Sequence, residues 1–448
     1  TILSVISLVS YVLTKVAVTV YAGGLVFQQV FGIKELWGID FFWIAAIGLV
    51  VLTALYTIFG GMKSVLYTSV LQTPILLLGS LIILVLGFKE LGGWDEMMRV
   101  CGAVTVNDYG DTMTNLIRSN DDANFPWLGA LIGSAIIGFW YWCTDQFIVQ
   151  RVLSGKNEKE ARRGTIFGAY LKLLPVFLFL IPGMIAFALH QKYIGAGGEG
   201  FLPMLANGTA NADAAFPTLV AKLLPAGVKG LVVCGILAAL MSSLASLFNS
   251  SAMLFTIDFY KRFRPETPEK KLVGIGQIAT VVIVILGILW IPIMRSVGDV
   301  LYTYLQDVQS VLAPGIAAAF LLGICWKRTS AQGGMWGLIA GMIIGLTRLG
   351  AKVYYSNAGE VADSTFKYLF YDMNWLFFCG WMFLFCIIVV IVVSLATEAP
   401  TAEKIQGLVF GTATKEQKAA TRASWDHWDI IHTVIILAIT GAFYWYFW

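Results

Sequence analysis

Long apolar runs recur along almost the whole chain, and no other feature limits its fold as strongly. Each run is about 20 residues long, the length of an α-helix that crosses the hydrocarbon core of a bilayer. Only 13% of the 448 residues are charged, whereas soluble domains carry about a quarter. We therefore expect an all-α integral membrane protein. The eleven expected spans cover approximately residues 4–31, 40–60, 64–88, 127–150, 164–190, 229–258, 272–295, 299–326, 332–351, 373–396 and 430–448.

Basic residues in the short loops predict the orientation of the chain. The loops 151–163 and 261–271 each hold five basic and two acidic residues, and Lys327-Arg328 closes another short loop. The loop 89–126 holds three basic and seven acidic residues. Because positively charged loops stay in the cytoplasm, we expect residue 1 inside and the C-terminus outside. The short loops favour a multi-pass protein of a cell membrane, specifically a bacterial inner membrane.

Several function classes are excluded by what the sequence lacks. It has no phosphate-cradling glycine loop, no cluster with metal-ligand spacing and no nucleophile elbow, so we do not expect an enzyme. Its formal net charge of +3 is too small to indicate nucleic-acid binding. Without a nucleotide-binding domain, direct drive by ATP within this chain is not expected either.

Ala239, Ser242 and Ser243 are spaced i, i+3, i+4 in the expected helix 229–258, so they share one face. Two hydroxyls and nearby backbone carbonyls make a neutral oxygen cage that suits a small hard cation such as sodium. The alternative is that these serines bond to their own helical turn or pack against a neighbouring helix.

The expected helix 127–150 carries the sequence FWYWCTDQ (139–146), preceded by Gly133 and Gly138. Glycines, a dense aromatic cluster and then Asp145 are unusual in a uniform helix, and transporter sites are often built on broken helices near the midplane. Aromatic rings there could stack on the apolar face of a sugar and close a gate. An aromatic belt or core packing is the alternative.

Polar side chains in two further helices could bind a hydroxylated solute. Lys172 lies three residues before Pro175; it can donate hydrogen bonds if it faces the bundle, or extend to the membrane surface. Gln306 and Gln309 share a face, and glutamine both donates and accepts, although an amide bond between helices is the alternative.

A proline-glycine pair and two aspartates lie near these glutamines, and a regular series of glycines follows in the next helix. Pro314-Gly315 is predicted to interrupt the helix, and Asp299 and Asp307 are expected near the outer mouth. In the following helix a glycine recurs at every fourth position, which predicts a smooth stripe for close helix packing. These glycines are Gly333, Gly337, Gly341 and Gly345.

Four stretches of the chain resemble the sodium/glucose cotransporter branch of the sodium/solute symporter family. The similarity runs over essentially the whole chain, and the first two stretches are long and specific. They are WYWCTDQFIVQRVLSGKN (140–157), ALMSSLASLFNSSAMLFTIDFY (239–260), YLQDVQSVLAPGIAAAFLLGICWKR (304–328) and GGMWGLIAGMIIGLTRLG (333–350).

This resemblance implies the inverted-repeat fold of the leucine-transporter type, a core of two five-helix repeats with extra helices around it. Residues 1–326 would form the transporter core, holding core helices three to ten, and residues 327–448 the peripheral C-terminal helices. The first helix, around Tyr11, Thr14 and Lys15, looks like the third core helix. We therefore expect that the N-terminal helices of the family are missing from this sequence.

The resemblance also implies roles for individual residues. The carbonyl of Ala239 and the hydroxyls of Ser242 and Ser243 resemble the sodium ligands of the eighth core helix. The other positions resemble those that contact the sugar: Tyr141, the inner-gate tyrosine; Trp142, its aromatic neighbour; Lys172, the sugar-binding lysine; and Gln306, the sugar-binding glutamine.

Two positions depart from the sugar-transporting pattern. In the stretch Tyr67-Thr68-Ser69, Ser69 replaces an aspartate linked to cation passage or to a second cation site. Thr19 likewise stands where relatives often carry an acidic residue. These two departures leave the number of sodium ions carried per cycle open.

The sequence thus predicts a secondary active transporter that couples sodium influx to uptake of a hexose such as glucose or galactose, without an obligatory protein partner. One alternative keeps the mechanism but carries myo-inositol, another polyol or a sugar acid. Another, left open by Ser69, is a sugar-responsive sensor or channel that does not concentrate its ligand.

Overall fold

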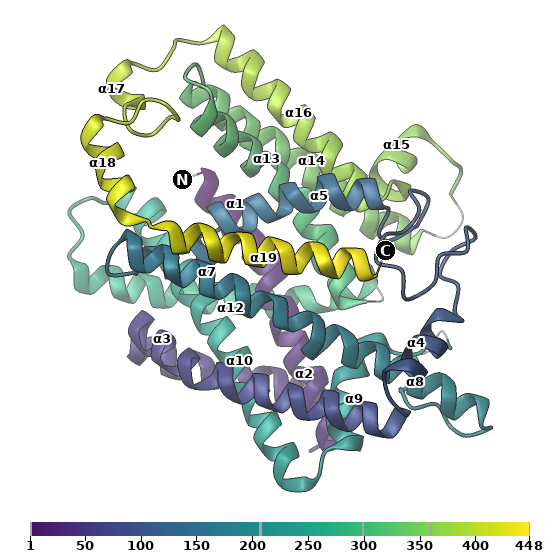
Figure 1. The fold of residues 1–448 in the computed structure, drawn as a ribbon. Helices are drawn as coiled ribbons and strands as arrows, with labels where there is room; N and C mark the ends of the chain where they lie inside the picture. The colour runs from purple at the N-terminus through teal and green to yellow at the C-terminus, as the bar shows by residue number, and fades with distance from the viewer. Residues whose placement is uncertain (1, 206–207, 298–299, 359–360, 448) are drawn as a thin grey trace.

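The computed structural model describes residues 2–205, 208–297, 300–358 and 361–447, with the backbone alone at several positions between 56 and 71 and at 294–297. Asp299, expected near the outer mouth, lies outside these residues. The chain folds into a bundle of packed helices (Figure 1). A two-residue hairpin of strands β1 (Glu35–Leu36) and β2 (Ile39–Asp40), paired antiparallel, precedes the third helix.

The helices of the first half begin and end as follows. They are α1 (Ile2–Ser10), η1 (Tyr11–Val16), α2 (Ala17–Phe31), α3 (Phe41–Leu91), α4 (Trp94–Gly102), α5 (Trp127–Phe139), η2 (Trp140–Thr144), α6 (Gln146–Leu153), α7 (Glu158–Pro175), η3 (Val176–Leu180), α8 (Ile181–Gly195), η4 (Ala212–Ala214) and α9 (Ala215–Leu223).

The second half continues in the same way. Its helices are α10 (Ala226–Met253), η5 (Leu254–Tyr260), α11 (Lys261–Phe263), α12 (Glu269–Val297), α13 (Leu301–Cys325), α14 (Ala331–Asn357), α15 (Thr365–Lys367), η6 (Tyr368–Asp372), α16 (Trp375–Ala396), α17 (Ala402–Ile405), α18 (Lys415–Ser424) and α19 (His427–Tyr446). The η segments are π-helical, except η4, which is a 3-10 turn.

Among the described residues, nine helices are long and apolar enough to cross a membrane, and each overlaps a predicted span. A tenth predicted span, 127–150, corresponds to a bent pair of helices. The predicted spans 40–60 and 64–88 both lie in α3, where Gln72–Leu91 meets the criteria and Phe41–Leu55 is a shorter apolar helix. The separate span predicted at 40–60 is therefore not confirmed.

Local signals set several of the helix ends. Gly32 ends α2 with a φ of +67°, a left-handed conformation that glycine adopts without strain. The carboxylate of Asp40 then caps α3 by accepting a hydrogen bond from the Phe42 N–H at 3.0 Å. Ser330 caps α14 in the same manner, accepting from the Gly333 N–H at 3.0 Å.

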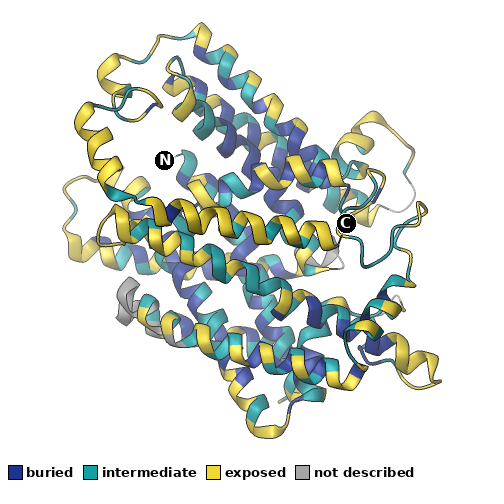
Figure 2. Ribbon diagram, viewed as in Figure 1, coloured by how far each residue is buried: buried dark blue, intermediate teal, exposed yellow. Residues whose placement is uncertain are grey.

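The buried side chains concentrate inside the bundle, where α10 packs on α3 and where α13, α14 and α16 pack together (Figure 2). The largest core cluster is formed by residues of η1, α2, α3, α10, α12, α13 and α16, with single residues of α6, η5 and α14. Helix α19 instead lies on the outside against α7, and nearly all of it is exposed (Figure 2). Its long apolar surface is what a lipid-facing helix requires.

The glycine stripe of α14 packs as the sequence predicts. All four of its glycines are buried against α13 or α16. A Cβ atom at Gly341 would lie 2.9 Å from the Cα atom of Gly315, and one at Gly345 would collide with the carbonyl of Val311. The backbones of α13 and α14 therefore approach more closely than any side chain would allow.

The prediction that Pro314-Gly315 interrupts its helix is wrong. Helix α13 continues from Leu301 to Cys325 through both residues. Proline removes one backbone hydrogen bond, but Gly315 fits against Gly341, and the packing of α13 between α14 and α16 holds the helix together.

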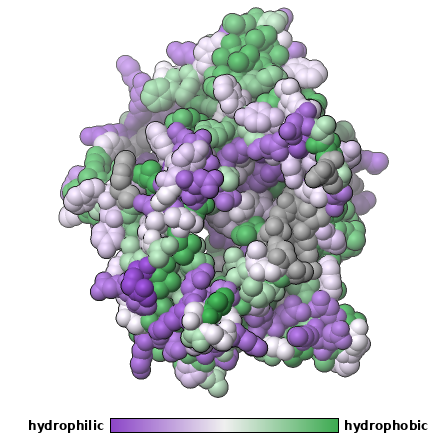
Figure 3. All heavy atoms as spheres, turned by 90° about the vertical axis from the view of Figure 1, so that its right-hand side faces the viewer, coloured by the Kyte–Doolittle hydropathy of each residue, from purple (hydrophilic) through white to green (hydrophobic). Residues whose placement is uncertain are grey.

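The two termini lie at opposite ends of the bundle (Figure 1). At one end, Arg162 and Arg163 of the positively charged loop contact Ser424 and Asp426, at 2.9 and 3.4 Å. At the other end, the Leu116 N–H donates to the Phe447 carbonyl at 3.0 Å. Hydrophilic residues are spread over the end that carries the C-terminus (Figure 3). The positively charged loop 151–163 and the loop 89–126 thus lie at opposite ends of the bundle, and the predicted inside and outside assignment stays a prediction.

Candidate sodium and substrate sites

The helix that carries the predicted aromatic cluster is broken at Asp145. The segments Trp127–Cys143 and Gln146–Leu153 meet at 47°. The first segment ends in the π-helical η2, and the following Asp145 is extended, with φ −75° and ψ 118°. The Asp145 carboxylate caps α6 by accepting from the Phe147 N–H at 3.2 Å. The broken helix that the sequence predicts here is confirmed.

The same carboxylate joins two distant segments. The Tyr11 hydroxyl donates to Oδ1 of Asp145 at 2.7 Å, and the Lys15 ammonium pairs with Oδ2. Tyr11 and Lys15 both belong to η1. Lys15 is 8% exposed and Asp145 4%, and buried charges of this kind persist only when they are paired and hydrogen-bonded.

Aromatic rings enclose the Lys15 ammonium. Its Nζ atom lies 4.4 Å from the ring centroid of Phe147, 4.9 Å from that of Tyr11 and 5.1 Å from that of Tyr141. Ring faces attract a cation, more strongly where water is excluded. Tyr141 therefore rests on a buried ion pair that ties η1 to the helix break.

Sequence reasoning missed this pair, although a signal was present. Lys15 stands in the middle of the apolar run 4–31 and Asp145 in the run 127–150. Each charge needs a partner inside the membrane. This shared need marks both residues as functionally or structurally important, but it does not by itself say which charges meet.

Tyr141, Trp142 and Lys172 come together on one side of the break. The rings of Tyr141 and Trp142 meet edge to face, with centroids 5.1 Å apart. The Lys172 ammonium lies 5.6 Å from the Trp142 ring centroid. Trp142 is 52% exposed, and Lys172 is exposed as well. These side chains thus offer a ring face and a hydrogen-bond donor to a solute.

Gln306 is not joined to this group by any contact within the described part of the chain. It lies in α13, partly buried, and its Nε2 atom donates to the Tyr302 hydroxyl at 2.8 Å. Gln309, on the same helix, is buried with 6% exposure. The structure therefore brings together three of the four predicted substrate residues, and the fourth lies closer to the start of α13.

The three predicted sodium ligands lie on α10, where it packs against α3. Ser242 is buried with 7% exposure, whereas Ala239 and Ser243 are partly exposed. The Ser242 hydroxyl oxygen lies 2.6 Å from that of Ser69, within hydrogen-bond distance. Hydroxyl and carbonyl oxygens are hard ligands suited to a hard cation.

The next two turns of α10 also carry serines that bind polar groups. The Ser246 hydroxyl donates to the Ser242 carbonyl at 3.0 Å and accepts from the Arg151 guanidinium. Gln150 donates to the Ser250 hydroxyl at 2.6 Å. Helix α6, which follows the break at Asp145, is thereby attached to the helix that carries the predicted sodium ligands.

No group of three or more His, Cys, Asp and Glu side chains that could hold a metal ion occurs in the described ranges. A cation site built from hydroxyl and carbonyl oxygens would not give such a group. The six cysteines are all free thiols.

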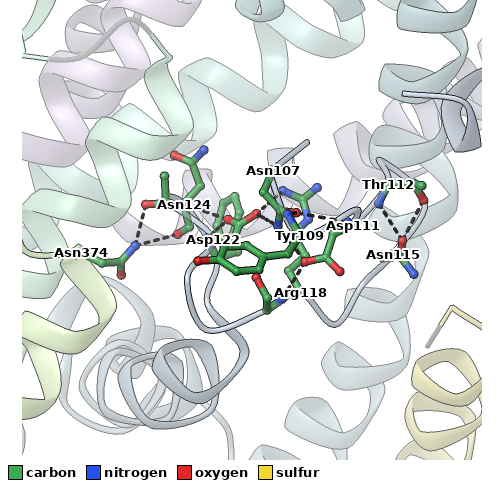
Figure 4. Close-up of polar contacts among 12 residues, drawn as sticks. Asn107, Tyr109, Asp111, Thr112, Asn115, Arg118, Asp122, Asn124 and Asn374 are labelled. Atoms are coloured by element: carbon green, nitrogen blue, oxygen red, sulfur yellow. Dashed lines mark hydrogen bonds and ion pairs between the residues drawn. The ribbon is translucent and has the colours of Figure 1, made fainter. Parts of the chain in front are cut away.

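A polar loop covers the end of the bundle that carries the C-terminus. Asn107 donates to Asp111 at 2.7 Å, and the Asp111 carboxylate also accepts from the Ser119 N–H at 2.7 Å (Figure 4). Asp122 accepts from the N–H groups of Asn124 and Phe125. These bonds fold 103–126 on itself, and Asn374 at the start of α16 secures it by donating to the Ala123 carbonyl (Figure 4).

A helical bundle with a broken span, an aromatic group beside the break and a cluster of hydroxyl groups on a neighbouring helix is typical of membrane transporters of the inverted-repeat class. The chain matches the Sodium:solute symporter family over residues 1–341. It belongs to that family. Membership confirms the resemblance seen in the sequence. The family consists of sodium-coupled transporters rather than enzymes, as the sequence predicts.

Several relatives are about one-third identical to this chain. A sodium/mannose cotransporter of Bos taurus is 35% identical over 466 residues, covering 99% of this chain and 77% of the relative. The sodium/myo-inositol cotransporter 2 of Homo sapiens is 35% identical, covering 92% and 62%. The sodium/glucose cotransporter 1 of Ovis aries is 37% identical, covering 88% and 61%. The chain thus spans less than two thirds of the length of the last two.

A solved structure shows the same fold. A Na+-coupled sialic acid symporter, captured substrate-bound and outward-open, superposes with a TM-score of 0.63 over 89% of this chain and 76% of its own. The two sequences are 20% identical. The similarity supports the expected fold class, whereas the roles of the individual site residues stay predictions.

Proposed function

We propose that this chain is a sodium-driven symporter that carries a sugar or a cyclic polyol into the cell by alternating access. The observation that best supports this proposal is the helix break at Asp145. Tyr141, Trp142 and Lys172 lie close together there, beside a buried ion pair. Transporters of this class build their substrate sites on broken helices near the middle of the membrane. The names of the relatives agree with it.

Sodium would bind at Ala239, Ser242 and Ser243 of α10. The proposal is supported by the Ser69–Ser242 contact, which turns the Ser242 hydroxyl toward α3. A cation between two helices exchanges its water shell for fixed hydroxyl and carbonyl oxygens. Binding would therefore favour the arrangement in which α3 and α10 stay closest together.

The solute would bind against the ring of Trp142, with hydrogen bonds from Lys172 and Gln306. A sugar ring carries C–H groups on its face and hydroxyls on its rim, which suits one aromatic surface with donors at its edge. Tyr141 would act as the inner gate. Its ring rests on Lys15, so movement of Tyr141 requires the environment of the Lys15–Asp145 pair to change.

The proposal divides the chain as the family resemblance implies. Residues 1–326 would form the moving core and 327–448 the peripheral helices. The sodium gradient supplies the drive, together with about 2.3 kcal/mol per charge for each 100 mV of membrane potential. A bacterial inner membrane is the proposed location.

The proposal is tested by reconstituting the protein into liposomes with an inward sodium gradient. Uptake of labelled glucose, galactose, mannose and myo-inositol is measured with sodium and with choline. Accumulation above the external concentration that requires sodium, and that Ser243→Ala reduces, supports symport. Competition among the four solutes, with a sugar acid added, ranks the substrates. Uptake without sodium dependence contradicts symport.

The Ser69 position favours one second candidate, a sensor or channel that binds the solute without concentrating it. A hydroxyl there forms a contact with Ser242 but carries no charge to attract a cation. Solute-dependent sodium current without accumulation of the labelled solute would favour this candidate over the symporter.

A further inference from the structure

A cluster of three charges, two of them buried and the third partly buried, joins α13 to α14. Asp307 of α13 is 7% exposed and Arg348 of α14 is completely buried. The Arg348 guanidinium lies 3.7 Å from Oδ1 of Asp307, and the Lys352 ammonium pairs with Oδ2. Both cations are on one face of α14, one turn apart, so they hold the carboxylate from the same side.

The cluster is fixed on its far side as well. Arg348 donates to the carbonyls of Leu369 and Met373, at 3.3 and 2.7 Å. Its guanidinium carbon lies 4.1 Å from the ring centroid of Phe378. Because Leu369 belongs to η6 and Phe378 to α16, the arginine ties Asp307 to three other elements. A carboxylate held in this way cannot turn without disturbing all of them.

Such a cluster is costly to bury, because two cations share one carboxylate. Glycine packing already holds α13 against α14, so the charges are not needed to bring these helices together. The charged cluster can instead fix the rotation of α13 about its own axis, which packing between smooth glycine surfaces does not do.

Asp307 directly follows Gln306, the predicted substrate ligand. The first N–H of α13, at Leu301, is itself held by both carboxylate oxygens of Asp213, each at 3.1 Å. The first two turns of α13 are thus fixed at Leu301 and again at Asp307. Gln306 lies between these two points, and Tyr302 is its hydrogen-bond partner.

We infer that Asp307 is a positioning residue for Gln306, acting through its ion pairs with Arg348 and Lys352. The cluster sets the rotation of α13, and this rotation directs the Gln306 amide toward the solute. The inference rests on the proposed function, since it gives a transport role to a cluster that touches no solute. Consecutive residues on a helix point about 100° apart, so fixing Asp307 fixes the direction of Gln306.

Transport kinetics in liposomes test the inference. Asp307→Asn is expected to raise the KM for the best-transported solute about tenfold, as the loss of one well-aimed hydrogen bond does. The sodium concentration for half-maximal uptake and the maximal rate should change by about twofold or less. The exchange Asp307→Lys with Lys352→Asp should recover most of the lost affinity. Asp363→Asn, in the exposed pair with Lys367, is the matched control and should change nothing.

A second measurement does not depend on transport. Gln306→Cys is labelled with a water-soluble thiol reagent, in a background where the exposed cysteines are replaced by serine. These are Cys143, Cys234 and Cys325. Adding Asp307→Asn should change the labelling rate of the introduced thiol severalfold, whereas adding Asp363→Asn should not.

The outcomes separate the inference from the proposed function. If no solute is transported but the labelling rate changes, the proposed function fails and the positioning role stands. If Asp307→Asn folds, and leaves both the KM and the labelling unchanged, the inference is wrong. It is also wrong if the variant alters KM, sodium dependence and maximal rate by equal factors, because that result describes general damage.

Discussion

The hydroxyl oxygens of Ser69 and Ser242 lie 2.6 Å apart, and they link α3 to α10 at the level of the predicted sodium ligands. Ser69 is one of the two positions at which the sequence is expected to depart from the sugar-transporting pattern. A carboxylate there would bring a negative charge to the cation. The serine instead forms a neutral contact that orients the Ser242 hydroxyl.

Replacement of these two serines should have unequal effects on sodium dependence. We predict that Ser242→Ala raises the sodium concentration for half-maximal uptake about tenfold, because an oxygen ligand is lost. Ser69→Ala should raise it only about twofold to threefold, since the ligand remains but loses its partner. The measurement is uptake against sodium concentration. Ser80→Ala, a buried serine further along α3, serves as control, and equal effects of all three variants would contradict the assignment.

The Lys15–Asp145 pair should be strongly coupled. We predict that Lys15→Met lowers the free energy of unfolding by about 3–5 kcal/mol, because it leaves a buried carboxylate unpaired. The double variant with Asp145→Asn should be more stable than Lys15→Met alone, since the uncompensated charge is then absent. Thermal unfolding in detergent measures both. A Lys15→Met variant as stable as the unaltered protein would show that the pair is open in solution.

Solute affinity should depend on the exposed side chains beside the break. Trp142→Ala and Lys172→Ala are each predicted to raise the KM for the solute about tenfold, through loss of a stacking surface or of a hydrogen bond. The sodium dependence should stay the same. Trp336→Ala removes a ring of similar exposure on α14 and should have no effect. If it raises KM equally, the effect of Trp142 is not specific to the solute site.

The glycine stripe should tolerate substitution only where space exists. Gly345→Ala is predicted to destabilise the protein by about 1–3 kcal/mol, because its Cβ would meet the Val311 backbone, which cannot move aside. Gly350→Ala, also in α14, meets no atom within 4 Å and should be neutral or slightly stabilising. Melting temperatures of the two variants provide the comparison, and equal temperatures would contradict the close approach of α13 and α14.

Acid should loosen the loop 103–126 before the bundle. The Asn107 amide and the Ser119 N–H hold the pKa of Asp111 below its usual range. A carboxylate whose pKa is lowered on folding stabilises the loop above its unfolded pKa of about 3.9, and this stabilisation is lost as the pH falls through the folded pKa.

Hydrogen exchange of 103–126 between pH 6 and pH 3, corrected for intrinsic rates, measures this effect. Protection should fall with pH in the unaltered protein. Asp111→Asn should reduce protection at pH 6 and flatten the dependence, whereas Asp108→Asn, at a neighbouring carboxylate, should not. An unaltered pH dependence in Asp111→Asn would assign the effect to other groups.

Most of the architecture follows from patterns that act over one helix length. Apolar runs predicted the spans because a bilayer requires about 20 apolar residues. A glycine at every fourth position predicted the packing stripe of α14. The aromatic-rich segment FWYWCTDQ predicted a broken helix. Each of these depends on neighbours within a few turns, so the sequence carries the information locally.

The pairings across the bundle could not be predicted in the same way. Lys15 and Asp145 are far apart in sequence, and so are Asp307 and Lys352. Which charges meet depends on how helices rotate and tilt against each other, and apolar periodicity constrains rotation only loosely. The prediction that Pro314 interrupts its helix was wrong for a related reason. Packing against other helices, which the local sequence does not reveal, kept α13 continuous.

In the described ranges, four π-helical segments overlap predicted spans, namely η1, η2, η3 and η5. A π turn closes its hydrogen bond one residue later than an α turn, so it stores one additional residue. If such a turn migrates along its helix, the residues that it passes swivel by about 100° while the helix stays intact. Lys15 lies in η1, and Tyr141 and Trp142 lie in η2. The ion pair and the predicted gate tyrosine thus lie in segments whose rotation would let them change partners in discrete steps, at the cost of very few backbone hydrogen bonds.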